Sequence, residues 1–336
     1  MSRSDINSKI ISIIVTYGCR KTYLLSVIDR LKIEGIDKLI VVNNGSNWQV
    51  QSVLSCANQD IIDVINLNEN TGSANAYAIG IERAICIGAD FIWLLDDDNL
   101  PDVGSLKKLL DIYIYENKKN EQSLLACTPY RVDQYGELDK FLLSKTINAR
   151  ENSFCNFHVY DIPRRILNKF GINEKIEFKR FVSLKAAPYG GLFFSAKLVE
   201  RIGLPDKNLI LYGDDIEYTR RITRNSGRIL MDTSINIKDL ESSWKSIKAR
   251  PRILEGWLIG QGDFRAFYAM RNMTYVDLNF GANNKIIFLT NFLIFKFILR
   301  IFSYKYHAQE RYKLLCEAIN AGLHSNLGVN KKYPLP

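Results

Sequence analysis

The sequence predicts an α/β fold in which a largely parallel sheet is covered by helices on both faces. Short, continuous apolar runs are typical of strands buried on both faces, and they occur at Ile10–Val15, Leu39–Val42, Ile61–Ile65 and Phe91–Leu95. Stretches with a helical pattern separate these runs, which favours right-handed crossovers between parallel neighbours. Each run is also followed directly by polar residues. Because ligands collect beyond the carboxyl ends of such strands, we expect one polar crevice at that edge of the sheet.

The later part of the chain predicts a further strand and then a mostly helical region. Gly190–Ser195 is a short apolar run, Asp214–Asn225 begins with acidic residues as helices often do, and the pattern from Arg265 to Leu323 is helical. The segment 126–181 has no strong periodicity, so we interpret it as substrate-facing loops. We therefore expect a nucleotide-binding and catalytic domain over residues 1–245 and a helical region over 246–336.

Composition and charge narrow the class of protein. The 336 residues include 45 Lys and Arg against 36 Asp and Glu, a formal charge of +9, which favours anionic partners. The basic residues are spread along the chain, without a dense run or an aromatic RNA-binding motif, so nucleic acid is not the expected partner. Six scattered cysteines without a Cys-x-x-Cys pair indicate reduced thiols, and the polar start lacks the apolar run of a secretion signal. We expect a cytoplasmic protein.

Three consecutive carboxylates, Asp96, Asp97 and Asp98, follow the fourth apolar run. Adjacent carboxylates repel one another unless a cation or hydrogen-bond donors compensate them. If the segment stays extended, Asp96 and Asp98 point to one side and Asp97 to the other, so the outer pair could share a metal ion. Mg²⁺ or Mn²⁺ bound by such carboxylates and by diphosphate oxygens would suit a nucleotide-sugar donor. The alternative is a solvated acidic turn before the next helix.

A second acidic pair, Asp214 and Asp215, opens the predicted helix that runs to Asn225. Capping of the helix accounts for one carboxylate. The other is a suitable general base for an acceptor hydroxyl that must lose its proton as it attacks a sugar. We prefer Asp215 for this role, with Asp214 as the second choice.

The order of these motifs resembles that of the family 2 glycosyltransferases of bacterial surface polysaccharide synthesis, which have the GT-A fold. The motifs that carry the resemblance are Val15-Thr16-Tyr17, Val42–Ser46, Glu69–Asn75, Trp93–Asp98, Gly190–Phe194, Ile202–Pro205, Tyr212–Tyr218 and Tyr268–Asn272. The resemblance implies an inverting, metal-dependent transferase without a covalent intermediate. It implies that Thr16, Tyr17, Arg20, Asn43, Asn70 and Gly72 surround the nucleotide, that Asp96, Asp97 and Asp98 hold the metal and the sugar diphosphate, and that Asp215 is the base.

Two positions depart from the pattern of that family. Asn43 stands where many relatives have an aspartate that points to the nucleotide. Relatives also often place a histidine metal ligand shortly after the late acidic motif, whereas the three histidines here lie elsewhere, at positions 158, 307 and 324. Asp239 is the best substitute, since a carboxylate is a hard ligand that suits Mg²⁺ or Mn²⁺. The alternative is that Asp239 is a surface residue and that water completes the metal site.

The resemblance also favours certain substrates. The motifs most resemble those of galactofuranosyltransferases, which use UDP-galactofuranose. The motifs of rhamnosyltransferases, which use dTDP-rhamnose, are also similar. The implied acceptor is a glycan, for many relatives one carried on undecaprenyl diphosphate, in O-antigen or capsule-type synthesis. A nucleotidyltransferase is disfavoured because the early Gly-rich phosphate loop is absent, and a non-catalytic glycan-binding scaffold is disfavoured by the intact carboxylate clusters. Trp244 and Trp257 could stack on an acceptor sugar or could belong to the core.

The segment Ile286–Phe302 is apolar but is interrupted by Lys296 and Arg300. Seventeen residues with two charges are a poor membrane span, so two interpretations remain: a buried helix, or a basic interfacial helix that holds the protein on the inner face of the cell membrane. In the second case we expect Phe292, Phe295 and Lys296 to take part in docking. The C-terminal helices could also form a homo-oligomer.

Overall fold

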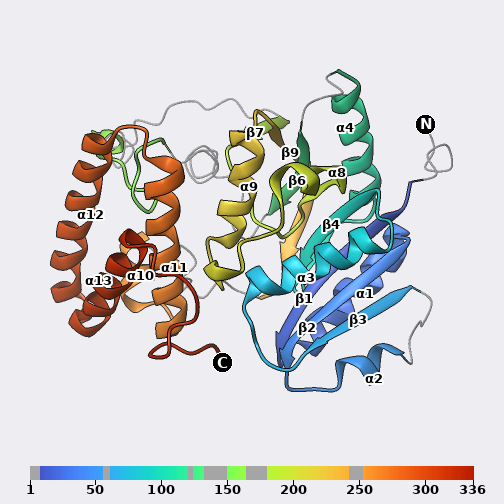
Figure 1. The fold of residues 1–336 in the computed structure, drawn as a ribbon, viewed down its shortest axis with the longest axis horizontal. Helices are drawn as coiled ribbons and strands as arrows, with labels where there is room; N and C mark the ends of the chain where they lie inside the picture. The colour runs from blue at the N-terminus through green and yellow to red at the C-terminus, as the bar shows by residue number, and fades with distance from the viewer. Residues whose placement is uncertain (1–7, 56–60, 120–123, 132–149, 164–179, 242–252) are drawn as a thin grey trace.

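The computed structural model describes residues 8–55, 61–119, 124–131, 150–163, 180–241 and 253–336. In these residues the chain forms a mixed sheet flanked by helices, followed by a C-terminal group of helices (Figure 1). The strands are β1 (Ile10–Gly18), β2 (Lys38–Ser46), β3 (Ile62–Leu67), β4 (Phe91–Asp96), β5 (Asn99–Pro101), β6 (Leu125–Arg131), β7 (Phe181–Leu184), β8 (Phe193–Ser195) and β9 (Arg228–Asp239).

The helices divide between the two parts of the molecule. Those that follow or cover the sheet are α1 (Lys21–Glu34), α2 (Val50–Ser55), α3 (Ser73–Cys86), α4 (Ser105–Lys119), α8 (Lys197–Ile202) and α9 (Asp214–Arg224). Those of the C-terminal group are α10 (Ile253–Ile259), α11 (Asp263–Val276), α12 (Lys285–Lys305) and α13 (Gln309–Leu323). Single turns occur at η2 (Val159–Asp161), η3 (Lys207–Leu209) and η4 (Asp277–Gly281).

The strands described form one sheet in the order β3-β2-β1-β4-β8-β6-β9-β5, and β7 pairs with β9. The first four strands in this order are parallel, as the apolar runs predict. Strand β8 is antiparallel to both β4 and β6, while β6 and β9 are again parallel. The prediction of loops throughout 126–181 is therefore wrong at both ends, since β6 and the start of β7 are strands. The rest of that segment lies largely outside the described residues.

The two faces of the sheet bury separate apolar cores. Ile11, Ile13 and Val42 face one core together with α3, α8 and α9, while Ile14 and Val41 face the other together with α1 and α4. Alternate residues of one strand thus enter opposite cores, which explains why β1 and β2 read as continuous apolar runs.

The helix α3 lies unusually close to the sheet. A Cβ atom at Gly80 would lie 2.6 Å from a methyl group of Ile13 and 3.2 Å from one of Val42. Only glycine permits this approach without displacing the strands. It lets the middle of α3 pack closely against β1 and β2.

A third core joins the C-terminal helices to segments that precede them in the chain. Phe154 and Ile210 pack in it with residues of α11, α12 and α13. Trp257 is also buried there, so it does not form an exposed stacking platform, and Trp244 lies outside the described residues. The expected division between residues 245 and 246 falls in the segment 242–252, which the structure does not describe, and it stays a prediction.

Candidate active site

The register of the parallel strands brings their polar ends to one edge of the sheet. Thr16 at the end of β1 lies opposite Asn43 of β2, and Val15 lies opposite Asp96, the last residue of β4. Polar residues that are far apart in the sequence therefore meet because their strands end at the same level. The predicted crevice has its structural basis in this register.

The acidic triplet does not continue the strand. Asp96 ends β4, and Asp97 and Asp98 form the turn that leads into β5. Asn99 fixes this turn: its side-chain oxygen accepts a hydrogen bond from the backbone N–H of Asp96 at 3.0 Å, and its Nδ2 donates to Oδ1 of Asp239 at 2.9 Å. Strand pairing places Asn99 directly opposite Asp239. Asp239 thus lies beside the acidic turn.

Arg20 lies against this turn from the end of β1. Its guanidinium contacts Asp97 at 3.0 Å, Asp98 at 3.1 Å and Glu241 at 2.6 Å, and it also lies 5.0 Å from the ring centre of Tyr17. Asp97 and Asp98 therefore face the same cation. The expectation that they point to opposite sides is wrong, because the chain turns after Asp96 and extended geometry ends there.

Arg131, at the end of β6, is a second cation in the cluster. Its Nη2 lies 2.7 Å from Oδ1 of Asp239, and its Nη1 lies 3.5 Å from Oδ2 of Asp96. The side chain is almost fully buried. The sequence analysis does not predict Arg131, because it interprets the segment that contains β6 as a loop. Arg131 is a charged residue at the end of an apolar strand, and this is the signal that could have identified it.

Negative charge exceeds positive charge around the turn. Two arginines face the carboxylates of Asp96, Asp97, Asp98, Asp239 and Glu241. Burial raises the pKa of Asp98 to about 6, and the neighbouring charge of Asp96 adds to the shift while Arg20 opposes it. Burial also raises the pKa of Asp97 to about 8 despite Arg20. A further cation bound here would lower both pKa values.

The donor set fits a hard divalent cation. All the surplus groups are carboxylate oxygens, which Mg²⁺ and Mn²⁺ prefer. Among the residues that the structure describes, no three acidic, histidine or cysteine side chains are already arranged around a single metal position. Asp96 and Asp98 stay the predicted ligands of the ion. Oδ1 of Asp239 accepts hydrogen bonds from Arg131 and Asn99, and the role of Asp239 as a metal ligand stays a prediction.

The second acidic pair lies beside the first cluster. Asp214 and Asp215 begin α9, and the charge of Asp96 raises the pKa of both. For Asp215 burial is the largest cause and brings the pKa to about 6, with Arg131 opposing the shift. For Asp214 burial again dominates, followed by the charge of Asp215, and brings the pKa to about 8.

The two residues of this pair differ in their surroundings. Asp214 is buried, and its Oδ2 accepts a hydrogen bond from the hydroxyl of Ser73 at 2.9 Å. Asp215 is only partly buried, and its Oδ1 accepts a hydrogen bond from the backbone N–H of Ile216. Asp215 can therefore meet a substrate from solvent, whereas Asp214 connects α9 to α3. This difference supports the preference for Asp215.

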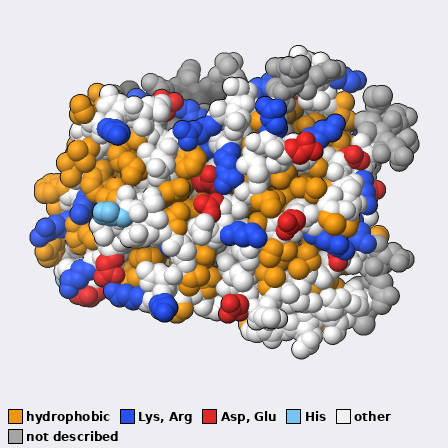
Figure 2. All heavy atoms as spheres, in the orientation of Figure 1, with side chains coloured by type: hydrophobic (Ala, Val, Ile, Leu, Met, Phe, Trp, Pro, Cys, Tyr) orange, Lys and Arg blue, Asp and Glu red, His pale blue; other side chains and the backbone are white. Residues whose placement is uncertain are grey.

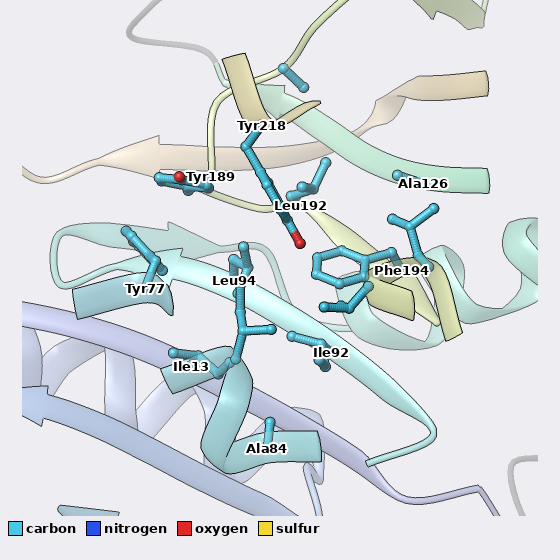
Figure 3. Close-up of a cluster of buried hydrophobic side chains, with 14 of the residues drawn as sticks. Ile13, Tyr77, Ala84, Ile92, Leu94, Ala126, Tyr189, Leu192, Phe194 and Tyr218 are labelled. Carbon is cyan, nitrogen blue, oxygen red and sulfur yellow. The ribbon is translucent and has the colours of Figure 1, made fainter. Parts of the chain in front are cut away.

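Two tyrosines line the apolar side of the acidic cluster. The hydroxyl of Tyr77 donates to Oδ1 of Asp96 at 2.8 Å, and the rings of Tyr77 and Tyr189 lie 4.3 Å apart. Figure 3 shows these two side chains to the left of Leu94, as members of the same buried cluster. Tyr77 thus fixes one oxygen of Asp96 and leaves the other toward Arg131. Nothing in the sequence marks Tyr77 except its position one helical turn after Ser73.

The residues predicted around the nucleotide have mixed roles. Near the carboxyl end of β2, the side chain of Asn43 donates a hydrogen bond to the side chain of Asn66 and accepts one from the backbone N–H of Ser46. Its neighbour Asn44, which was not predicted, is buried and bonds to Asn70 and to the backbone carbonyl of Gly72. Asn70 therefore stabilises the loop before α3 through Asn44.

Gly72 has a packing role. Its φ is +87°, and a Cβ atom there would lie 2.2 Å from the carbonyl oxygen of Ile210. That same oxygen accepts a hydrogen bond from the backbone N–H of Ala74. Gly72 thus allows the segment before α9 to lie against the start of α3, which brings Asp214 close to Ser73.

Part of the chain matches a known protein family. Residues 12–169, which contain the acidic turn and Arg131, match the family model described as Glycosyl transferase family 2. That segment is similar to family 2 glycosyltransferase domains. The resemblance identified from the ordered motifs is therefore confirmed.

Two curated relatives of the family 2 domain are named for different donor sugars. The chain is 28% identical over 191 residues to galactofuranosyltransferase GlfT1 of Mycolicibacterium smegmatis, a match that covers 56% of each protein. It is 27% identical over 223 residues to dTDP-rhamnosyl transferase RfbF of Shigella flexneri, covering 64% of each. The matches span little more than half the length of these relatives.

A solved structure shows the fold. TarS residues 1–349 of S. aureus, in complex with UDP-GlcNAc, aligns with a TM-score of 0.51 and 13% identity over 93% of this chain and 81% of that one. At this identity the likeness concerns the fold alone. The prediction of a GT-A fold with a C-terminal helical region is confirmed.

Proposed function

We propose that this protein is an inverting glycosyltransferase that moves a sugar from a nucleotide donor to a glycan acceptor. One observation carries the proposal: Asp96 at the end of β4 lies close enough to the pair that opens α9 for its charge to add to burial in raising the pKa of Asp214 and Asp215. A diphosphate group at the first cluster would then hold its sugar in reach of a base at the second. This is the juxtaposition that direct displacement requires.

In the proposed reaction, Asp215 takes the proton from the acceptor hydroxyl. The oxygen attacks the anomeric carbon as the bond from that carbon to the diphosphate breaks, and the nucleoside diphosphate leaves with the bonding electrons. One displacement inverts the configuration. With a pKa of about 6, Asp215 is ionised at neutral pH and still basic enough to accept the proton.

The other residues position these groups. Tyr77 orients Asp96, and Arg131 holds Asp239 against the turn. Mn²⁺ or Mg²⁺ held by Asp96 and Asp98 would neutralise charge that develops on the departing diphosphate. Arg20 faces the same place and supplies positive charge from the end of β1. Thr16, Tyr17 and Asn43 lie at the ends of the neighbouring strands, where the base and ribose would bind.

The donor and the acceptor are finer parts of the proposal. UDP-galactofuranose is favoured because one relative is named a galactofuranosyltransferase, and dTDP-rhamnose is the alternative because another is named a rhamnosyl transferase. A glycan on a lipid diphosphate carrier is the acceptor that we favour, in surface polysaccharide synthesis at the inner face of the cell membrane. We retain the proposed division into a catalytic domain of residues 1–245 and a helical region of 246–336.

Calorimetric titration with UDP, dTDP and GDP, each with Mn²⁺ and with EDTA, tests the proposal. We expect one diphosphate to bind, and to bind more tightly with Mn²⁺. A preference for UDP supports the galactofuranose donor, and a preference for dTDP supports rhamnose. Absence of binding by all three nucleotides, in protein shown to be folded by circular dichroism, would refute the transferase assignment.

A further inference from the structure

The helix α12 has two apolar faces that differ in their surroundings. Among the described residues it is the one helix long and apolar enough to cross a membrane by length and composition. One face packs in the third core through Phe288, Phe292, Phe295 and Leu299, against the other C-terminal helices. Because this face is occupied by protein, the helix cannot be surrounded by lipid.

The opposite face of α12 is exposed along the whole helix. It presents six large apolar side chains whose exposed fractions range from 51% to 77%: Ile286, Leu289, Leu293, Phe297, Ile301 and Tyr304. Their spacing of three or four residues puts them in one stripe. Figure 2 shows apolar side chains gathered along the left edge of the molecule, where Figure 1 places α12. A continuous exposed stripe of this kind indicates an interaction surface.

The charges on α12 have a single sign. The helix contains Lys285, Lys296, Arg300 and Lys305, and it has no Asp or Glu. Arg300 is exposed within the apolar stripe, and Lys285 and Lys305 are exposed at the two ends of the helix. Long basic side chains can keep their charge in water or near phosphate while their methylene groups lie along an apolar surface.

We propose that the exposed face of α12 docks on an anionic lipid bilayer, with the helix lying in the plane of the interface. The apolar stripe would enter the boundary between headgroups and acyl chains, while the basic residues would meet lipid phosphates. A symmetric contact with a second copy is less suitable. It would bring Arg300 and the lysines of two α12 helices together without an acidic residue on either helix.

The structure also corrects which residues take part. Phe292 and Phe295, expected from the sequence to contribute to docking, are buried in the third core. Leu293 and Phe297 are exposed instead, each within the stripe. Substitution of the first pair would test folding, and substitution of the second pair tests docking.

Flotation of the purified protein with liposomes tests the inference. We expect binding to vesicles that contain 30 mol% phosphatidylglycerol in phosphatidylcholine, weaker binding to phosphatidylcholine alone, and loss of binding at high salt. The double variant Leu293→Ser and Phe297→Ser should lower the partition coefficient by on the order of tenfold or more, because two large apolar groups no longer leave water. A double variant at Lys296 and Arg300 to Gln should remove the dependence on anionic lipid.

Matched controls separate this inference from the proposed function. Ile33→Ser and Val103→Ser remove apolar side chains of similar exposure elsewhere on the surface and should leave flotation unchanged. Asp215→Asn should also leave it unchanged, since docking does not depend on the carboxylates. Wild-type protein that fails to float with anionic vesicles would overturn the inference, as would equal flotation of the Leu293/Phe297 variant. A wild-type dimer that this variant converts to monomer, with no lipid binding, would instead assign the face to a second copy.

Discussion

Replacing Asp215 by Asn gives the most direct test of the catalytic arrangement. The substitution keeps the size of the side chain, and an amide oxygen can still accept the hydrogen bond from the backbone N–H of Ile216. The N-terminal turn of α9 should therefore keep its structure. What is lost is the ability to take a proton.

The expected loss of turnover follows from the role of a general base. Removal of such a base typically costs on the order of 10²–10⁴ in rate, or about 3–5 kcal/mol in the barrier. Donor binding should be nearly unchanged, because the diphosphate is expected at the other cluster. Initial rates of nucleoside diphosphate release, measured with a synthetic acceptor at saturating donor, give the value.

The pH dependence supplies a second readout of the same group. Burial raises the pKa of Asp215 above its ordinary value to about 6, so the carboxylate is about nine-tenths ionised at pH 7 and about one-tenth at pH 5. Because only the ionised form accepts a proton, kcat of the wild type should fall roughly tenfold between these pH values. The residual rate of the Asn variant should lack this step.

Asp214→Asn is the matched control for Asp215→Asn. The pKa of Asp214 is raised to about 8, so most of this residue is already neutral at pH 7, and an amide can still accept the hydrogen bond from Ser73. We expect less than about a tenfold change in turnover. Near-normal turnover of the Asp215 variant, or a greater loss in the Asp214 variant, would show that the base is assigned wrongly.

Two further predictions concern the metal and the fold. Asp98→Ala should reduce the affinity for the nucleoside diphosphate in Mn²⁺ to the value measured in EDTA, because one of two carboxylates that would hold the ion is lost; an undiminished response to Mn²⁺ in calorimetry would exclude Asp98 from the site. Gly72→Ala should destabilise the protein by more than the roughly 1–3 kcal/mol typical of a strained backbone, since its Cβ would overlap the carbonyl of Ile210. Gly88→Ala is the control in thermal unfolding: Gly88 has a similar φ of +80° but open space around it, so equal losses of Tm would refute the overlap argument.

The sequence by itself determined the first half of the sheet and the position of the site. The runs around Ile13, Val41 and Leu94 are apolar at nearly every position, with Ser12 the exception, because their strands are covered on both faces, so each strand could be recognised locally. Parallel strands end at one edge, and the residues that follow them had to meet there. The position of the acidic turn at this edge followed from this regularity and from the ordered motifs.

Only the tertiary structure decided how the charges are paired and how deeply each of Asp214 and Asp215 is buried. Arg131 reaches Asp239 through the pairing of β6 with β9, and Tyr77 reaches Asp96 through the close contact of α3 with the sheet. No local pattern specifies either contact. The same holds for the difference in burial between Asp214 and Asp215.

The faces of α12 show the physical reason most clearly. Phe295 and Phe297 are two residues apart in α12, and apolar residues occur on all sides of this helix. The periodicity of apolar residues therefore does not distinguish its buried face from its exposed face. Packing against α13 and α10 buries Phe295 and leaves Phe297 in solvent. A strand that is buried on both faces is apolar at successive positions, so its own sequence indicates its burial. Which face of α12 is buried depends instead on the helices that pack against it.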